Sequence, residues 1–177
     1  MNRESRHTNT PGGTNATHRC TPAHLSILHG KDVVYLIEER APGRPSLVTD
    51  VGVRLPAELT ASGRAMLSHL STAQFRALYP SRDVLVDRTG TGPRSVSELR
   101  QIVSAARGRG YGQEIGDVSP GLASVAVAVT DRHAYPAAAV AVTFDREKVD
   151  DEELIATVFR IRQITNALQA NLGYRTG

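Results

Sequence analysis

The chain has 177 residues, a formal net charge of +3 and 40% hydrophobic residues. This length suits a single domain with a sizeable core, and no apolar run reaches the roughly 20 residues that a membrane span needs. The first twenty residues lack an apolar centre, so the sequence predicts no signal peptide and no contact with a membrane.

Charge and cysteine content narrow the class further. The basic residues are mostly arginines that stand singly, a pattern typical of a solvated surface rather than of a nucleic-acid footprint. There is no tryptophan, which argues against an aromatic platform for single-stranded nucleic acid. The single cysteine, Cys20, excludes an internal disulfide and favours a reducing compartment, so we expect a cytoplasmic protein.

Taken in order, the chain begins with a polar stretch and a hairpin. Residues 1–22 are rich in Asn, Thr, Gly, His and Pro and cannot bury enough apolar surface to offset the entropy of ordering, so we expect a loose arm. Residues 24–28 and 33–40 then read as two strands around a turn at Gly30, which supplies the positive φ that such turns favour. A further short strand is expected over residues 46–51.

The next segment predicts two helices. Thr60 is a suitable N-cap for a helix over residues 61–70, and a shorter helix follows it as far as Tyr79. The first turn of the longer helix, Ala61-Ser62-Gly63, is small, so its free N–H groups and the positive end of the helix dipole are open to an anion such as a carboxylate. Nearly all helices have such an end, so a second feature must converge on it to indicate a site.

Two further helices are marked by their caps. Ser95 with Glu98 forms a capping box that opens a helix ending near Gly110, and Asp150 with Glu153 opens the last helix. The last helix carries an apolar stripe that we expect to face the core: Leu154, Ile155, Val158, Ile161, Ile164, Leu168 and Leu172.

Residues 122–144 organise the rest of the chain as two strands around a polar turn at residues 131–136. One face of this hairpin is large and apolar, with Val125, Val127, Val129, Val140, Val142 and Phe144. The opposite face carries only small side chains: Ser124, Ala126, Ala128, Thr130, Ala139, Ala141 and Thr143. Protein interiors leave little empty space, so either a helix packs very close to this face or a small ligand fills the gap.

Strands that come in hairpins pair antiparallel, which indicates an α+β fold with helices packed on a sheet rather than a doubly wound parallel sheet. No histidine pair has the spacing of metal ligands, and neither a nucleophile elbow nor a phosphate-binding glycine loop is present. We therefore expect no enzyme, no metal site and no cofactor, although residues far apart in the sequence can still assemble one.

Five stretches in order resemble the effector-binding domain of isocitrate-lyase-regulator-type (IclR) bacterial transcription factors, from about His24 to Gly173. They are HLSILHGKDVVYLIEE, GVRLPAELTASGRAML, RGRGYGQE, PGLASVAVAV and AAVAVTF. No single stretch is specific to the family, whereas the ordered set is.

The resemblance implies a GAF-like or profilin-like α+β domain over residues 23–177, with helices packed on a curved antiparallel sheet. It also implies that a small organic ligand, often a carboxylate or an aromatic acid, lies between the sheet and a loop-helix segment. The matching positions are Ala61, Ser62, Glu114, Ser124, Ala141 and Thr143, and Leu55 and Leu122 would add apolar walls. These positions coincide with the free helix end and the small sheet face.

The chain departs from the family pattern at two pocket positions and in its N-terminal residues. Ala141 stands where a hydroxyl would suit a very polar acid and Ser124 where a thiol can occur, so we expect a pocket less polar than one built for a two-carbon oxoacid. Glu114 either accepts a hydrogen bond from a ligand hydroxyl or is a solvated strand-end residue. Residues 1–22 show no recognition helix, so we expect the family's winged helix-turn-helix, through which operator DNA would be bound, to be missing here.

Two functions follow as hypotheses, with an enzyme of the wider GAF-like group as a weaker third. The first is a sensing module, in which a small organic acid changes DNA affinity elsewhere in the full protein. The second is a structural dimer or tetramer module with a filled pocket, in which the hairpins and the long last helix associate with a second copy.

Overall fold

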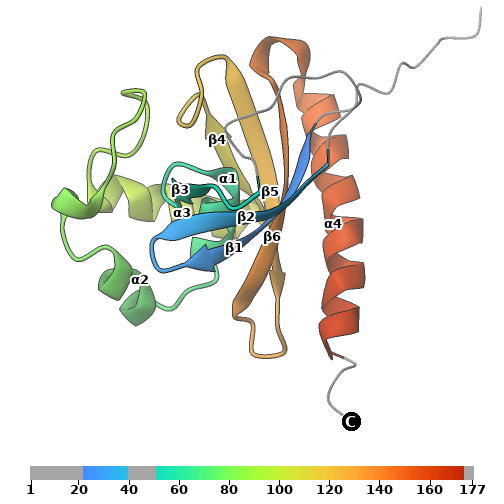
Figure 1. Ribbon diagram of the computed structural model, residues 1–177, viewed down its shortest axis with the longest axis horizontal. Helices are drawn as coiled ribbons and strands as arrows, with labels where there is room; N and C mark the ends of the chain where they lie inside the picture. Colours follow the sequence, from blue (N-terminus) through green and yellow to red (C-terminus); the bar gives the residue numbers. More distant parts are fainter. Residues whose placement is uncertain (1–21, 40–50, 174–177) are drawn as a thin grey trace, which may run out of the picture.

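The computed structural model describes residues 22–39 and 51–173, which form one sheet with helices on both of its faces (Figure 1). The strands are β1 (Ala23–His29), β2 (Asp32–Glu39), β3 (Arg54–Pro56), β4 (Gly112–Ile115), β5 (Leu122–Thr130) and β6 (Pro136–Asp145), in the order β3-β2-β1-β6-β5-β4. Every neighbouring pair is antiparallel, so the predicted α+β class is confirmed.

The helices form two unequal layers. The helices α1 (Ala61–Leu67), α2 (Thr72–Leu78) and α3 (Val96–Arg109) lie on one side of the sheet, and α4 (Asp151–Gly173) lies alone on the other (Figure 1). Two short 3-10 turns, η1 (Arg82–Val84) and η2 (Arg146–Lys148), complete the described chain. None of the helices described in residues 22–39 and 51–173 combines the length and the apolar character that a membrane span requires.

Both predicted hairpins are present. β1 and β2 meet at Gly30, which has a φ of +63°, and β5 pairs with β6 along its whole length. The short edge strand β3, which contains Leu55, pairs with β2. The predicted arm over residues 1–22 and the strand expected over 46–51 lie outside the described residues, except for the last residue of each.

Side-chain caps start the helices where the sequence predicts them. The Thr60 hydroxyl accepts from the N–H of Gly63 at 2.9 Å, and α1 then ends at Leu67, three residues earlier than expected. Ser95 opens α3 by accepting from the Glu98 N–H at 3.1 Å. The α3 helix ends at Arg109 and is capped by Gly110, whose φ of +75° is a left-handed conformation that glycine adopts readily.

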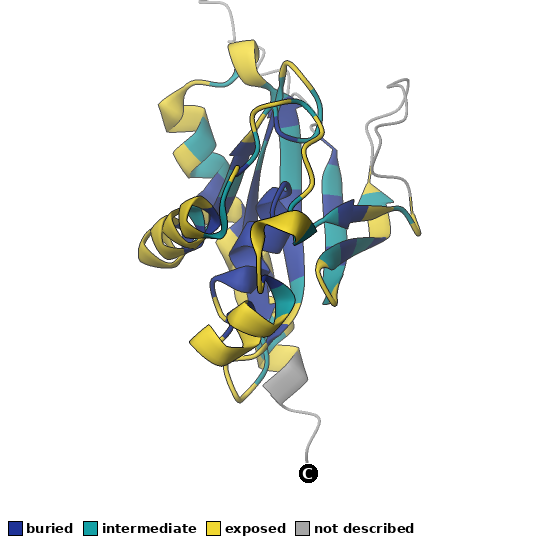
Figure 2. Cartoon of the chain, turned by 90° about the vertical axis from the view of Figure 1, so that its left-hand side faces the viewer, coloured by how far each residue is buried: buried dark blue, intermediate teal, exposed yellow. Residues whose placement is uncertain are grey.

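Two apolar cores lie on opposite faces of the sheet. The outer core joins the valine and phenylalanine face of β5 and β6 to α4, as the alternation predicts. The inner core joins the small face to α1, β2, β3 and α3. Figure 2 looks from the side of α1–α3 and shows the sheet and α1 as the buried centre, with exposed surface on the surrounding helices and loops.

The predicted stripe on α4 is correct only along its middle. Val158 and Ile161 are buried, whereas Ile155 is 65% exposed and Ile164 is 54% exposed. The reason is geometric: α4 packs mainly on β5 and β6, and a helix on a single sheet buries only a narrow strip. Positions 155 and 164 lie on the two flanks of that strip, and the polar Thr165 is buried between them.

Candidate functional site

The middle of the small sheet face is covered directly by α1. A Cβ atom added to Gly112 on β4 would lie 2.1 Å from the carbonyl oxygen of Ala61 and 2.6 Å from the nitrogen of Ala65. Ala126 and Ala141, which are paired across β5 and β6, are buried in the same cluster. Over this part of the face, the small side chains therefore make room for a close helix, one of the two alternatives that the sequence left open.

A row of three polar side chains crosses the same face next to the covered part. Glu114, Ser124 and Thr143 lie directly opposite one another on β4, β5 and β6, and so point to one side of the sheet. The Ser124 hydroxyl donates to Glu114 Oε1 at 2.7 Å, and the Ser124 and Thr143 oxygens are 3.0 Å apart. Glu114 is buried, and the two hydroxyl residues are half-buried.

The second oxygen of Glu114 faces a buried ion pair. Glu114 Oε2 accepts from the backbone N–H of Asp117 at 3.1 Å, and the Asp117 carboxylate is paired with the Arg64 guanidinium. Burial raises the pKa of Glu114, partly opposed by the hydrogen bonds from Ser124 and the Asp117 N–H. The ionised form of Glu114 is therefore stabilised by these two donors. Protonating Glu114 costs less free energy than protonating an exposed glutamate.

Arg64 ties this corner of the molecule together. Its guanidinium donates to the backbone oxygens of Glu58 and Gln113, at 2.9 and 2.8 Å, as well as to Asp117. One buried side chain on α1 thus holds the preceding loop, the edge strand β4 and the turn after it.

Ser62 adds a buried hydroxyl at the start of α1. Its Oγ has no hydrogen-bond partner within residues 22–39 and 51–173, and the residue is 1% exposed. The neighbouring N–H groups of Gly63 and Arg64 are taken by the side chain and backbone of Thr60. Such an unsatisfied hydroxyl costs about 1–3 kcal/mol, which a ligand could recover by bonding to it.

The structure places all eight predicted ligand residues on the inner side of the sheet or on the elements that cover it. Leu55, Ala61 and Ala141 share the inner apolar cluster. Glu114, Ser124 and Thr143 form the polar row. Leu122 is half-buried, two residues before Ser124 on the same face of β5.

Several polar groups at this site are not evident from the sequence. Arg64 and Asp117 are separated by 53 positions, so no local pattern connects them. His24 and Tyr35 lie on the same inner face, with their rings edge to face and 5.6 Å between centroids. In the structure β1 buries His24 and Ser26. The sequence alternation gave no signal for this, because its apolar residues Leu25 and Ile27 lie on the other face.

Metal ligands do not cluster in the described chain. Among residues 22–39 and 51–173, no three His, Cys, Asp or Glu side chains lie close enough together to hold a metal ion.

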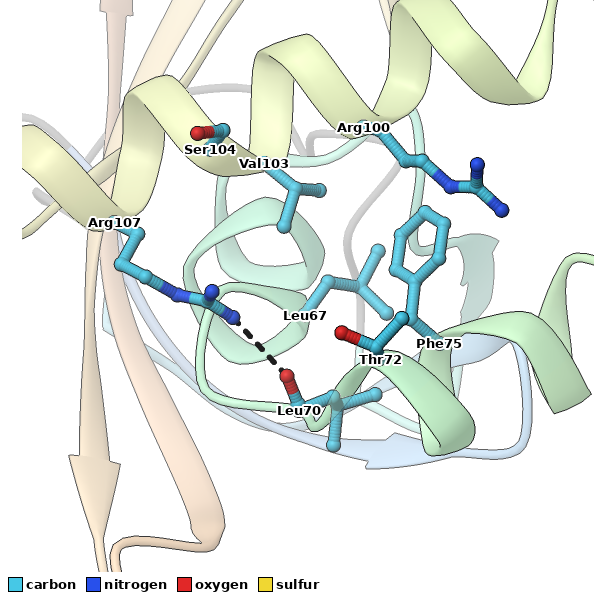
Figure 3. A pocket seen from close by; sticks show the side chains of 8 residues that line it. All are labelled: Leu67, Leu70, Thr72, Phe75, Arg100, Val103, Ser104 and Arg107. Carbon is cyan, nitrogen blue, oxygen red and sulfur yellow. Dashed lines mark hydrogen bonds between the residues drawn. The ribbon is translucent and has the colours of Figure 1, made fainter.

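A separate groove of about 110 Å³ lies between α1, α2 and α3 (Figure 3). It is lined by Leu67, Leu70, Thr72, Phe75, Arg100, Val103, Ser104 and Arg107. Arg107 donates to the backbone oxygens of Ser68 and Leu70, and Arg100 lies over the Phe75 ring, so both arginines have structural contacts. None of the eight predicted ligand residues lines this groove.

A comparison with protein-family models finds one match over most of the chain. Residues 17–170 match the family model described as bacterial transcriptional regulator IclR C-terminal. The chain belongs to this family. Members of the IclR family are transcriptional regulators and not enzymes, which confirms the regulator class expected from the sequence.

Individual relatives agree with the assignment to the IclR family. The glycerol operon regulatory protein of Streptomyces coelicolor is 29% identical over 155 residues, which cover 85% of this chain and 59% of that protein. The crystal structure of the Agrobacterium tumefaciens repressor BlcR has a TM-score of 0.76 and 27% identity, covering 87% of this chain and 60% of that one. The chain therefore spans about three fifths of the length of these two relatives.

A ligand-binding domain whose structure was solved on its own has the same fold as this chain. The inducer-binding domain of an Acinetobacter PobR double mutant, solved as a complex with 3-hydroxybenzoic acid, has a TM-score of 0.72 at 23% identity. It covers 84% of this chain and 87% of that one. At this identity the likeness is one of IclR fold alone.

Proposed function

We propose that residues 23–177 form a sensor for a small organic acid, whose binding changes the DNA affinity of the full-length regulator. The observation that supports this is the polar row Glu114–Ser124–Thr143 at the border of the alanine-lined, apolar part of the sheet face. Binding sites for small molecules combine apolar walls with a few placed polar groups, and this face offers both.

The other predicted residues complete the proposed site. Leu55 and Leu122 supply apolar walls, and the unsatisfied Ser62 hydroxyl supplies a donor for a carboxylate. Because Ala141 is packed against the covered part of the face, we expect the ligand to lie toward Ser124 and Thr143 rather than over the alanines.

The sensor would act through the rest of the regulator. A ligand shifts a two-state equilibrium only by its difference in affinity for the two states, so we expect the site to differ between the DNA-bound and free forms. Operator DNA would be bound by a helix-turn-helix domain of the full-length protein, and such a regulator would work in the cytoplasm.

A thermal-shift screen with small carboxylates tests the sensor. The screen includes 3-hydroxybenzoate as a probe, and a compound at 100 times its Kd adds about 2.7 kcal/mol to the free energy of unfolding. Thr143→Val and Ser62→Ala are expected to reduce the shift, with the distant Ser104→Ala as the matched control. A broad library that leaves the melting temperature unchanged would count against the sensor.

A second candidate function, self-association, is favoured by α4. Ile155 and Phe159 lie one turn apart on the same flank of this helix and are 65% and 62% exposed. Soluble proteins rarely leave large adjacent apolar side chains in water without a partner. We propose a second copy of the chain as that partner, in a symmetric dimer.

Light scattering coupled to size exclusion tests this interface. Phe159→Lys is expected to shift the dimer to a monomer and to leave the melting temperature of the dilute, monomeric protein unchanged, because the side chain contributes little to the core. The matched control is Arg160→Lys at the neighbouring exposed position. A wild-type chain that stays monomeric at millimolar concentration would exclude the dimer.

A further inference from the structure

We propose that the proton on Glu114 decides which ligand chemistry the site accepts: ionised Glu114 favours a hydroxyl that donates, and protonated Glu114 favours a carboxylate. The inference rests on the proposed ligand site and goes beyond it by assigning a ligand class to each form of the site.

The hydrogen-bond direction is set by Glu114 when it is ionised. A carboxylate only accepts, so the single hydrogen of the Ser124 hydroxyl is committed to Glu114 Oε1, at 2.7 Å. The contact between Ser124 and Thr143 must then be donated by Thr143. Thr143 Oγ1 is left with lone pairs alone and can only accept from a ligand.

One proton on Glu114 Oε1 reverses both hydroxyls. The protonated acid donates to Ser124 Oγ, Ser124 donates to Thr143 Oγ1, and the Thr143 hydrogen becomes free to point outward. No heavy atom has to move, because the same two contacts of 2.7 and 3.0 Å serve both directions. The end of the row changes from an acceptor to a donor.

Thr143 is the end of the row and the part that a ligand can reach. The residue opposite Thr143 on the β1 side of the sheet is Pro22, whose carbonyl accepts from the Thr143 N–H at 3.1 Å. The Pro22 side chain has no polar atom, so it does not extend the row. Thr143 Oγ1 has no other hydrogen-bond partner in residues 22–39 and 51–173, and the residue is half-buried.

The surroundings of Glu114 allow both protonation states. Burial raises the pKa of Glu114, and the Asp117 carboxylate acts in the same direction, while Arg64 opposes it. Burial also raises the pKa of the Tyr35 hydroxyl, so that group stays neutral. On the same face, His24 on β1 is a further side chain of a titratable type, and it must be tested separately.

The reversal couples carboxylate binding to protons. A carboxylate that needs the Thr143 donor binds only with Glu114 protonated, so one proton is taken up from solvent for each ligand bound. Affinity for the carboxylate can then rise by at most tenfold for each unit that the pH falls. A matched alcohol binds the ionised form and follows the opposite trend.

Two probe pairs isolate this effect: benzoate with benzyl alcohol, and glycerate with glycerol. Each pair differs in one group, and both acids remain ionised between pH 5.5 and 7.5. Dissociation constants from NMR titration are expected to be at least fivefold lower at pH 5.5 for the bound carboxylate, and equal or higher at pH 5.5 for its alcohol. Calorimetry in two buffers of different ionisation enthalpy is expected to give about one proton taken up per carboxylate.

Three variants separate the outcomes. Glu114→Gln should make the affinities independent of pH, and Thr143→Val should remove the difference between acid and alcohol while Glu114 is intact. Carboxylate binding that is unchanged with pH in the wild type overturns the inference and leaves the sensor standing. So does a pH dependence that persists in Glu114→Gln and disappears in His24→Gln. If neither member of either pair binds, the proposed site is overturned, and the inference with it.

Discussion

Arg64 is a buried cation with three separate acceptors, which makes it the residue on which the polar side of the site depends. Its partners come from the loop just before α1 and, 49 and 53 positions further along the chain, from the edge strand β4 and the turn that follows it. A buried charge that loses its partner raises the free energy of the folded state, so any movement that separates Arg64 from Asp117 is unfavourable. The pair therefore fixes these segments relative to one another rather than simply adding attraction.

Arg64→Met should lower the free energy of unfolding by about 3–5 kcal/mol, because it leaves the Asp117 carboxylate buried and unpaired. Urea denaturation followed by circular dichroism measures the loss. Arg76→Met, at an exposed position on α2, is the matched control and should change stability by about 0.5 kcal/mol or less. Adding Asp117→Asn to Arg64→Met should restore part of the loss. A single-variant effect below about 1 kcal/mol would contradict this role.

Glu114 makes stability depend on pH in a direction opposite to most acidic residues. Burial raises its folded-state pKa above the ordinary value of 4.5. The contribution of Glu114 to stability is therefore fully present below pH 4.5 and is lost as the pH rises through the raised pKa. The Glu114→Gln variant cannot ionise at this position. As the pH rises through that window, its free energy of unfolding should therefore increase relative to that of the wild type by up to about 1.4 kcal/mol per pH unit.

Urea titrations of both proteins from pH 4.5 to pH 8 measure this difference. The exposed Glu147→Gln is the control and should track the wild type at every pH. A gap between Glu114→Gln and the wild type that stays constant across the range would show that Glu114 titrates as an ordinary glutamate.

At the scale of elements, α1 rests on β4 at a distance that only glycine permits. The backbone of Ala61 and Ala65 occupies the space where a side chain on Gly112 would begin. The short, alanine-rich α1 and the small sheet face are thus two halves of one close contact, and the polar row begins where that contact ends.

Gly112→Ala should therefore destabilise the protein by about 2–3 kcal/mol, because its methyl group would overlap backbone atoms that cannot move aside separately. Gly108→Ala on α3 is the matched control: it has no atom within 4 Å of the added Cβ and should gain up to about 1 kcal/mol of helix stability. Thermal unfolding of the two variants compares them directly. Equal melting temperatures would mean that α1 can lift from the sheet at little cost.

The sequence predicts these elements well where the cause is local. Alternating side chains in β5 and β6, the hydroxyl caps at Thr60 and Ser95, and Gly110 at the end of α3 each act within a few residues. The position of α1 on Gly112 depends instead on two segments about fifty residues apart. The small face alone could not distinguish a close helix from a ligand.

The polar site was only partly predictable for the same reason. Ser124 and Thr143 stand on the small face by alternation, but their contact with Glu114 requires the register of three strands. The exposed flanks of α4 were mispredicted because apolar periodicity does not reveal how wide a surface the helix covers. Whether Ile155 and Phe159 meet a second copy is a property of the assembly, not of the helix.

At the scale of the whole molecule, both cores share the same two strands. β5 and β6 present valines to α4 on one face and alanines to α1 on the other. Hydrogen bonds also tie α4 to distant parts, since Gln169 donates to Thr130 at 2.6 Å and Arg162 donates to the backbone oxygen of Arg109 at 2.7 Å. We therefore expect the two faces to unfold as one unit rather than in separate steps.

Ile161→Ala in the outer core and Leu99→Ala in the inner core should each cost about 2–5 kcal/mol, because both remove a fully buried aliphatic side chain. Each variant should lower the hydrogen-exchange protection of amides in α3 and α4 alike, since opening one face exposes the strands that support the other. Phe159→Ala, on the exposed flank of α4, is the control and should leave protection nearly unchanged in the monomer. If Ile161→Ala loosened α4 while α3 kept its full protection, the helix would be a separable layer, and a signal from the ligand site could not reach it through the sheet.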